Sequence, residues 1–255
     1  MSTPIKTDIA DRKAPIQMLL SKPAQWIFSG VTVLSLTLVG VASCTPASLV
    51  EQGIENELPK YVGPAENYDV KIDGLKIGPG SADSVVAIGE RVKPEGAPVI
   101  DRLVLNLQGV TYSRQQKRLS QVDSAKLTAV IKSYDLADFL ESDRNVRSAE
   151  VILLSPDRAT LRIQPNLGSF SLPAGITVDV TGRLIGSGTK LSFEVEEVSA
   201  AGLDLSSMVA KRLSNLINPL ADLEDLPVKV EITSVMVAGE SIGLEVVGDP
   251  ASFSM

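Results

Sequence analysis

The feature that most limits how this chain can fold is the length of its alternating segments, in which every second residue is apolar. Residues 99–112 form a long example, with Leu103, Leu105 and Leu107 on one side of an extended chain and mostly polar side chains on the other. A strand with one apolar face must cover that face with helices, with a second sheet, or by curling around something.

Residues 190–195 alternate in the same way, with Leu191, Phe193 and Val195 on the apolar face. Further strands are predicted at 68–77, 121–132, 149–154, 160–164, 175–184, 228–237 and 242–247. Short turns join many of them, such as the hairpin turn at 155–158. Because short connections join antiparallel neighbours, the pairing is expected to be mostly antiparallel.

An amphipathic helix is predicted at residues 47–58, where Val50, Ile54 and Leu58 recur on one face and Pro59 stops the pattern. This helix follows the amino-terminal apolar segment with no flexible linker between them. If that segment is a membrane anchor, the domain behind it is expected to lie against the bilayer.

The clearest helix is predicted at 206–220. Its apolar stripe consists of Val209, Leu213, Leu216, Ile217 and Leu220. A helical turn is predicted at 135–140 and a short helix at 81–89. Together these elements predict an α+β architecture of long, mostly antiparallel strands with a few amphipathic helices, whose apolar faces are covered by helices, by a second sheet or by curling.

Cys44 is the only cysteine in the chain, and it ends the only long apolar run without charges, Ile27 to Ser43. The preceding residues 41–43 are Val-Ala-Ser, which fits a lipobox with an aliphatic residue followed by two small ones. We therefore predict that residues 1–43 are a cleaved signal segment and that Cys44 is a lipid attachment site.

Two alternatives remain open for this segment. Residues 23–50 contain no charge, so an uncleaved signal anchor would also fit, and a buried helix of a soluble protein is the third interpretation. Both membrane interpretations predict a domain anchored on the extracytoplasmic, or periplasmic, side, because the basic residues precede the apolar run. The domain is predicted at 44–248, with a loose tail at 249–255.

The charge of the chain argues against nucleic acid as a partner. Residues 1–43 contain four basic and two acidic residues, and the whole chain carries −7, so residues 44–255 carry −9. An acidic domain is repelled by nucleic acid and by anionic headgroups at long range. Association with a membrane is therefore expected from the anchor or from apolar contacts.

The residue types that are missing argue against an enzyme. The chain has no histidine, which removes the usual general base near neutral pH and the usual metal ligand. It has no cysteine besides Cys44, so thiolate chemistry and zinc sites are not expected. No catalytic residue, metal or cofactor is predicted.

Acidic residues lie in two clusters of the sequence. They are Glu194, Glu196 and Glu197, and Asp222, Glu224 and Asp225. Paired carboxylates can hydrolyse glycosides, and carboxylate groups can bind calcium. The spacing fits no EF-hand loop, and Glu194 and Glu196 share a polar strand face, so a solvated surface is predicted.

Four stretches of the chain form a pattern of Leu, Val and Gly. They are the strand–turn–strand unit Gly175–Val195, the helix-like run Leu203–Leu220, the segment Leu226–Val235 and the turn Asp135–Leu140. In their order over most of residues 47–247 they resemble the LmeA-like phospholipid-binding family, in which the last of them would correspond to the turn between the halves of the domain.

The resemblance implies an envelope protein that binds phospholipid. It also implies an α+β fold related to tubular lipid-binding domains, in which a long, strongly curved, mostly antiparallel β-sheet wraps amphipathic helices. It brings no catalytic residues. The expected function is a membrane-attached phospholipid carrier that holds acyl chains in an elongated cavity, for envelope lipid transport or homeostasis. The apolar residues expected to line that cavity are Leu103, Leu105, Leu107, Leu191, Phe193, Val195, Val209, Leu213, Leu216, Ile217 and Leu220.

Two other functions stay open from the sequence. A structural or adaptor lipoprotein would use all of these apolar faces as core and would bind no ligand. A hydrolase of envelope glycans would need two carboxylates in an open polar cleft.

Overall fold

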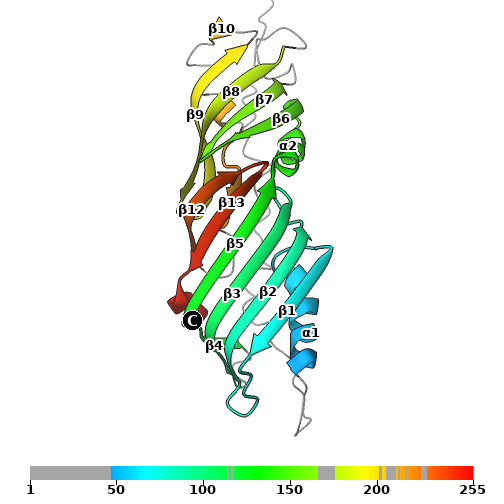
Figure 1. The fold of residues 1–255 in the computed structure, drawn as a ribbon, viewed down its shortest axis with the longest axis vertical. Helices are drawn as coiled ribbons and strands as arrows, with labels where there is room; N and C mark the ends of the chain where they lie inside the picture. The colour runs from blue at the N-terminus through cyan, green and yellow to red at the C-terminus, as the bar shows by residue number, and fades with distance from the viewer. Residues whose placement is uncertain are drawn as a thin grey trace, which may run out of the picture.

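The computed structural model describes residues 47–113, 115, 118–165, 176–200, 203–204, 211, 213–215, 217–224 and 229–254. Within them the chain forms two antiparallel sheets that follow one another along the long axis of an elongated molecule (Figure 1). We call them sheet A and sheet B.

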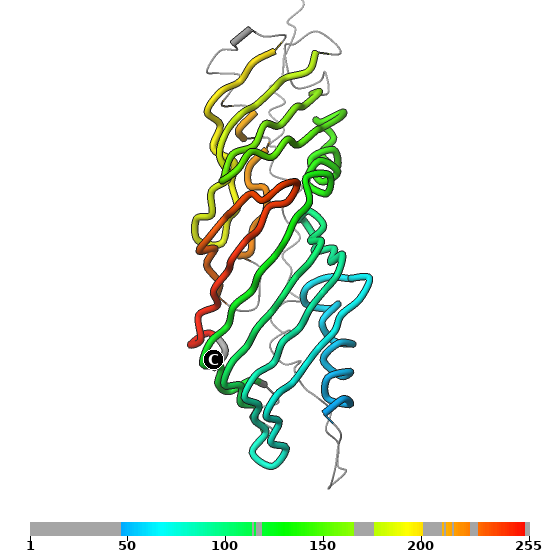
Figure 2. Tube along the Cα trace, viewed as in Figure 1, coloured from blue at the N-terminus to red at the C-terminus, as the bar shows by residue number. Residues whose placement is uncertain are grey.

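Sheet A has seven strands in the order β1-β2-β3-β5-β13-β12, with β4 paired to β3. The strands are β1 Asn67–Asp73, β2 Ser81–Val92, β3 Ile100–Ser113, β4 Arg118–Gln121, β5 Ser124–Lys132, β12 Val230–Ala238 and β13 Ser241–Gly248. The carboxyl-terminal hairpin therefore completes a sheet begun by the amino-terminal strands, with β13 lying beside β5 (Figure 2).

Sheet B has six strands in the order β10-β9-β8-β7-β6, with β11 paired to β9. The strands are β6 Val146–Leu154, β7 Arg158–Pro165, β8 Val178–Ser187, β9 Lys190–Ala200, β10 Leu203–Asp204 and β11 Ala221–Asp222. Strand β12 of sheet A adjoins sheet B, because its Ile232 and Val237 N–H groups donate to the carbonyls of Gly188 and Pro156 in two turns of sheet B.

Four short helices have defined bounds among the described residues. They are α1 Ala47–Glu57, η2 Leu58–Lys60, α2 Ser133–Glu141 and η3 Pro250–Ser254. Helix α1 lies beside the edge strand β1, and α2 packs on β6 of sheet B (Figure 1). The residues predicted as a loose tail include η3, which lies next to β4.

The predicted fold class is confirmed. Every strand pair among the described residues is antiparallel, and the sheets are strongly curled. The helices predicted at 47–58 and 135–140 are α1 and α2. Much of the helix predicted at 206–220 lies outside the described residues, and the described positions 211, 213–215 and 217 are helical.

The prediction of a short helix at 81–89 is wrong. These residues belong to β2, which pairs with β1 on one side and with β3 on the other. The segment contains small residues and only a weak alternation of polarity, so its local signal was ambiguous. Two neighbouring strands supply the hydrogen bonds that decide its conformation, and Val85 and Ala87 then point into the core.

The register gives sheet A one continuous apolar face. A single row of directly paired residues crosses six strands, and every member is apolar: Val70, Ala87, Leu105, Leu127, Val246 and Ile232. Sheet B has a comparable row in which every residue is buried: Val151, Leu161, Val180 and Val198. The apolar face therefore extends through both sheets.

The segment that follows α1 is fixed by a half-buried tyrosine. The hydroxyl of Tyr68 donates a hydrogen bond of 2.7 Å to the carbonyl of Gly63. Gly63 has a φ of +112°, and a Cβ there would lie 2.4 Å from the carbonyl oxygen of Lys93, so only glycine fits. The chain between α1 and β1 is thus held against the end of β2.

Alkaline pH is expected to weaken this attachment. Burial raises the pKa of Tyr68 from 10.0 to about 12, because the phenolate is disfavoured away from water. Its contribution to the free energy of unfolding is therefore complete below pH 10 and is lost as the pH rises from 10 towards 12. Denaturant titrations should show a larger loss in the native protein than in Tyr68→Phe, because burial also raises the pKa of Tyr61 and Tyr112 in both proteins.

Candidate functional site

The predicted lining residues fall into two hydrophobic clusters. We call the larger one the junction core, because it joins sheet B, α2 and the adjoining part of sheet A. It contains Leu103, Leu191, Phe193, Leu213, Ile217 and Leu220, and Val195 packs against it. The smaller cluster, the α1 core, contains Leu107, and Leu105 packs against it. Cys44, Val209 and Leu216 lie outside the described residues.

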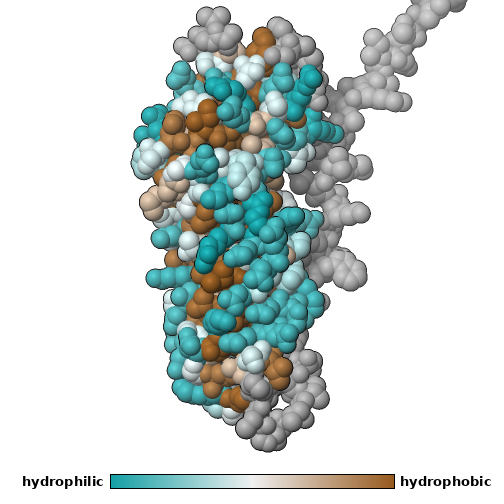
Figure 3. All heavy atoms as spheres, turned by 45° about the vertical axis from the view of Figure 1, so that its right-hand side comes forward, coloured by the Kyte–Doolittle hydropathy of each residue, from teal (hydrophilic) through white to brown (hydrophobic). Residues whose placement is uncertain are grey.

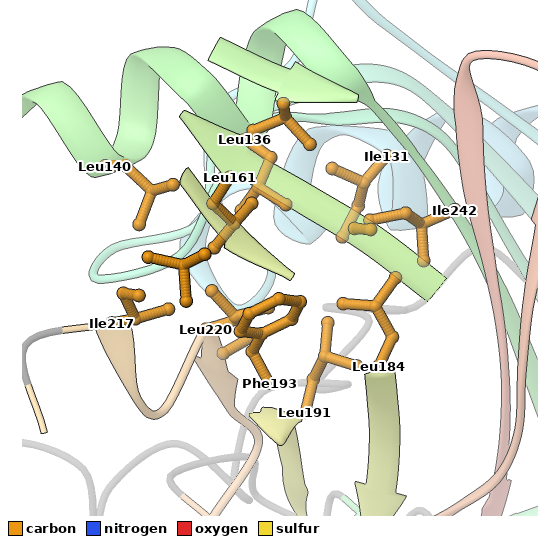
Figure 4. Close-up of a cluster of buried hydrophobic side chains, with 14 of the residues drawn as sticks. Ile131, Leu136, Leu140, Leu161, Leu184, Leu191, Phe193, Ile217, Leu220 and Ile242 are labelled. Atoms are coloured by element: carbon orange, nitrogen blue, oxygen red, sulfur yellow. The ribbon is translucent and has the colours of Figure 1, made fainter. Parts of the chain in front are cut away.

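The junction core is tightly packed. Leu191, Phe193, Leu213, Ile217 and Leu220 are each at most 3% exposed. Figure 4 shows Leu191, Phe193, Ile217 and Leu220 among side chains from α2, β5, β7, β8 and β13, including Leu136, Leu161, Leu184 and Ile242. The described residues of the stripe at 206–220 thus share one cluster with the apolar face of residues 190–195. Their role as a lipid-cavity wall stays a prediction.

Asn218 holds the end of the helical segment on sheet B. Its side-chain Oδ1 accepts a hydrogen bond of 2.6 Å from the N–H of Phe193, and its Nδ2 donates one of 2.8 Å to the Phe193 carbonyl. The amide thus pairs with β9 as a neighbouring strand would. Sequence analysis missed this residue, because a polar residue in an apolar stripe gives no sign of its partner.

Removing this amide should destabilise the protein. In Asn218→Ala both backbone groups of Phe193 lose their partner in a partly buried place, which should lower the free energy of unfolding by about 2 kcal/mol. Urea denaturation measures the change. The exposed Asn215 is the matched control, and Asn215→Ala should leave the stability nearly unchanged. Equal effects of the two changes would contradict the assigned role.

The α1 core joins the amino-terminal helix to sheet A. Val50 and Ile54 of α1 are 6% and 8% exposed. They belong to one cluster with residues from β1, β2, β3 and β5: Val70, Ala82, Val85, Ala87, Leu107, Val110 and Ala125, together with Val122. The predicted apolar face of residues 47–58 therefore covers one end of the apolar face of sheet A.

The two cores meet at one pair of leucines. Leu105 packs against the α1 core and Leu127 against the junction core, and the two residues are directly paired between β3 and β5. Both are only partly buried, although their neighbours on the same faces, Leu103, Leu107, Ala125 and Ala129, are at most 8% exposed. Within the directly paired apolar row of sheet A, Leu105 and Leu127 are thus the least covered residues.

Apolar side chains also reach the molecular surface. Figure 3 shows hydrophobic residues gathered in a broken band that runs lengthwise between hydrophilic ones.

Two residues of the acidic clusters, Glu196 and Asp222, form ordinary ion pairs at the surface. Glu196 accepts from Arg158 and forms an ion pair of 2.9 Å with Arg183. The hydrogen bond from Arg158 lowers the pKa of Glu196, which disfavours a role as general acid. Asp222 pairs with Lys190 at 3.2 Å. In the part of the chain that the structure describes, no group of three or more candidate ligands could hold a metal ion.

A second ionic group, which sequence analysis did not find, lies beside the junction between the sheets. Arg91 on β2 donates to both carboxylate oxygens of Asp135 on α2, over 2.6 and 2.7 Å. Asp135 is 2% exposed, the one buried charged residue among those described. Tyr134 and Asp101 also contact Arg91, with its guanidinium 5.7 Å from the Tyr134 ring centre and 3.5 Å from Asp101.

The backbone of Arg91 is as unusual as its side chain. Its φ is +53°, the only positive value among the described residues other than glycine. This conformation turns the end of β2, so that Val92 points into the junction core while Arg91 reaches α2. The local strain is offset by the ion pair, which fastens α2 to sheet A.

The fold is thus one of strongly curled antiparallel sheets that carry a shared apolar face. A sequence model of the LmeA-like phospholipid-binding family matches residues 45–246. The chain belongs to this family, and the match includes both sheets and both α-helices. No curated protein and no solved structure matches the chain. Among the described residues, no helix is long and apolar enough to cross a membrane.

Proposed function

We propose that this protein is a membrane-attached, extracytoplasmic carrier that holds phospholipid acyl chains along the apolar face of sheet A. It serves lipid transport or homeostasis in the cell envelope. Family membership supports phospholipid as the ligand. The observation that carries the proposal is the all-apolar row across six strands, which is least covered at Leu105 and Leu127.

Such a row suits an acyl chain for a simple reason. A lipid tail can form no hydrogen bond, so its binding surface must also be free of unsatisfied polar groups. Each methylene removed from water contributes about 0.8 kcal/mol, so even a partly covered tail is held firmly. In this proposal the row from Val70 to Ile232 supplies the wall, and the tightly packed junction core closes one end of it.

The attachment to a membrane rests on the amino-terminal sequence. The apolar run Ile27 to Ser43 and the lipobox ending at Cys44 precede α1, which begins at Ala47. The domain would therefore start within a few residues of the bilayer. In this proposal the binding is non-covalent, and two of the acidic residues, Glu196 and Asp222, form ion pairs with basic side chains.

Lipid transfer between vesicles tests the proposal. Full-chain protein in acceptor liposomes should speed the transfer of a fluorescent phospholipid from donor vesicles in proportion to the amount of protein. If folded protein in the liposomes leaves the transfer rate at its spontaneous value, the carrier function is wrong and a ligand-free structural or adaptor protein takes its place.

A further inference from the structure

The free edge of sheet A is covered by a helix in an unusual way. Strand β1 pairs with β2 on one side, and α1 lies along its other side. The N–H of Val70 donates to the carboxylate of Glu55 over 2.9 Å, and the N–H of Ile72 donates to that of Glu51 over 3.0 Å. Two helical carboxylates thus occupy the positions that the carbonyls of a neighbouring strand would take.

The spacing of these four residues explains why the contact forms. Four residues along a helix span about 6 Å, and two residues along a strand span about 6.7 Å. The distance between Glu51 and Glu55 along the helix therefore matches the distance between Ile72 and Val70 along the strand, so that each carboxylate reaches one N–H group. The adjacent helix face inserts Val50 and Ile54 into the α1 core. The helix covers the edge of the strand and the end of the apolar face at the same time.

The other boundaries of this apolar face are fastened differently. Strand β12 is bound to the turns of sheet B by main-chain hydrogen bonds of 2.8 and 2.6 Å. Helix α2 is continuous with β5 and carries the buried ion pair between Arg91 and Asp135. Helix α1 is instead hydrogen-bonded to β1 through side-chain carboxylates. When these bonds break, water can bind both the carboxylates and the strand N–H groups.

The segment that follows the carboxyl-terminal end of α1 is held in place and can serve as a hinge for the helix. The chain leaves the helix through η2 and reaches Gly63, which is fixed by Tyr68. Beside it, the N–H of Lys93 donates to the carbonyl of Pro64 over 2.8 Å. The carboxyl-terminal end of α1 is therefore anchored to β2, and a rotation about 58–63 would lift its Glu51 end away from β1.

We infer that α1 is a lid, and that the acyl chain of a membrane phospholipid reaches the apolar face of sheet A by passing between α1 and β1. This inference rests on the proposed function and adds the path and the moving part. The position of α1 directly behind the apolar run at 27–43 places the opening next to the bilayer. Leu49 on α1 is 56% exposed and gives the lid an apolar contact with the membrane.

Paired variants test the lid. Glu51→Ala with Glu55→Ala removes both acceptors, whereas Glu51→Gln with Glu55→Gln keeps an oxygen acceptor at each place. Glu141→Ala is the matched control, because Glu141 of α2 accepts from the edge-strand N–H of Ala149 over 2.8 Å in sheet B. Full-chain proteins in liposomes are compared by hydrogen exchange and by the uptake of fluorescent phosphatidylglycerol from donor vesicles.

In the double alanine variant, the amide hydrogens of Val70 and Ile72 should exchange at least about tenfold faster than in the native protein. The variant should also take up and release lipid faster by a similar factor. The glutamine pair and Glu141→Ala should keep the native uptake rate. Faster exchange at these amides with unchanged uptake would overturn the lid and leave the carrier function standing. If the native protein takes up no lipid, the proposed function fails, and the lid fails with it.

Discussion

Leu127→Asp is expected to abolish the retention of phospholipid while leaving the protein folded. Leu127 lies where the two cores meet, is only partly buried, and is paired with Leu105 in the centre of the apolar row. A carboxylate there would have to lose water when an acyl chain covers it, which should weaken lipid binding at least about tenfold. Because the site is partly open without lipid, the free energy of unfolding should fall by only about 2 kcal/mol.

The neighbouring residue supplies the control. Thr128 is exposed and points to the opposite face of β5, so Thr128→Asp adds the same charge to the same strand without touching the apolar row. This variant should bind phospholipid as the native protein does. Equal lipid binding by Leu127→Asp and Thr128→Asp, both folded, would show that the assigned face does not hold the ligand.

Arg91→Ala should have the largest effect on stability. The change leaves the carboxylate of Asp135, which is 2% exposed, without the guanidinium that binds both of its oxygens. Breaking a buried ion pair in this way should lower the free energy of unfolding by about 3 kcal/mol. This figure is the low end of the usual range for buried pairs, because the Arg91 side chain is 26% exposed. Guanidinium denaturation followed by circular dichroism measures the loss.

A second substitution separates the ion pair from other causes. Adding Asp135→Leu to Arg91→Ala removes the orphaned carboxylate, so the double variant should recover most of the lost stability. If the double variant is as unstable as the sum of the two single changes, the stability does not come from the pairing of these charges.

Much of the fold could be predicted because its signals are local. The alternation of Leu103, Leu105 and Leu107 identified β3, and the spacing of Val50 and Ile54 identified α1. Strand β2 was missed, since small residues alternate weakly and its two neighbours decide its conformation. Periodicity could tell which residues face inward, but not that Leu105 and Leu127 would be less covered than the residues around them.

The polar contacts could not be predicted, because each depends on a distant partner. Arg91 and Asp135 are separated by 44 positions, and Asn218 pairs with a backbone 25 positions away. The covering of β1 by Glu51 and Glu55 has the same origin, since an acidic residue on a helix gives no sign of the strand edge that it meets. In sequence these residues look like ordinary surface groups.

The central claim is that the apolar face of sheet A holds phospholipid, and the lipid that accompanies the purified protein tests it most directly. Residues 45–255, which include every described residue, would be exported without the anchor, purified and extracted with organic solvent for mass spectrometry. We expect phospholipid in stoichiometric amounts, and its loss in Leu127→Asp. A well-folded protein that carries no phospholipid and takes up none from vesicles would contradict the account.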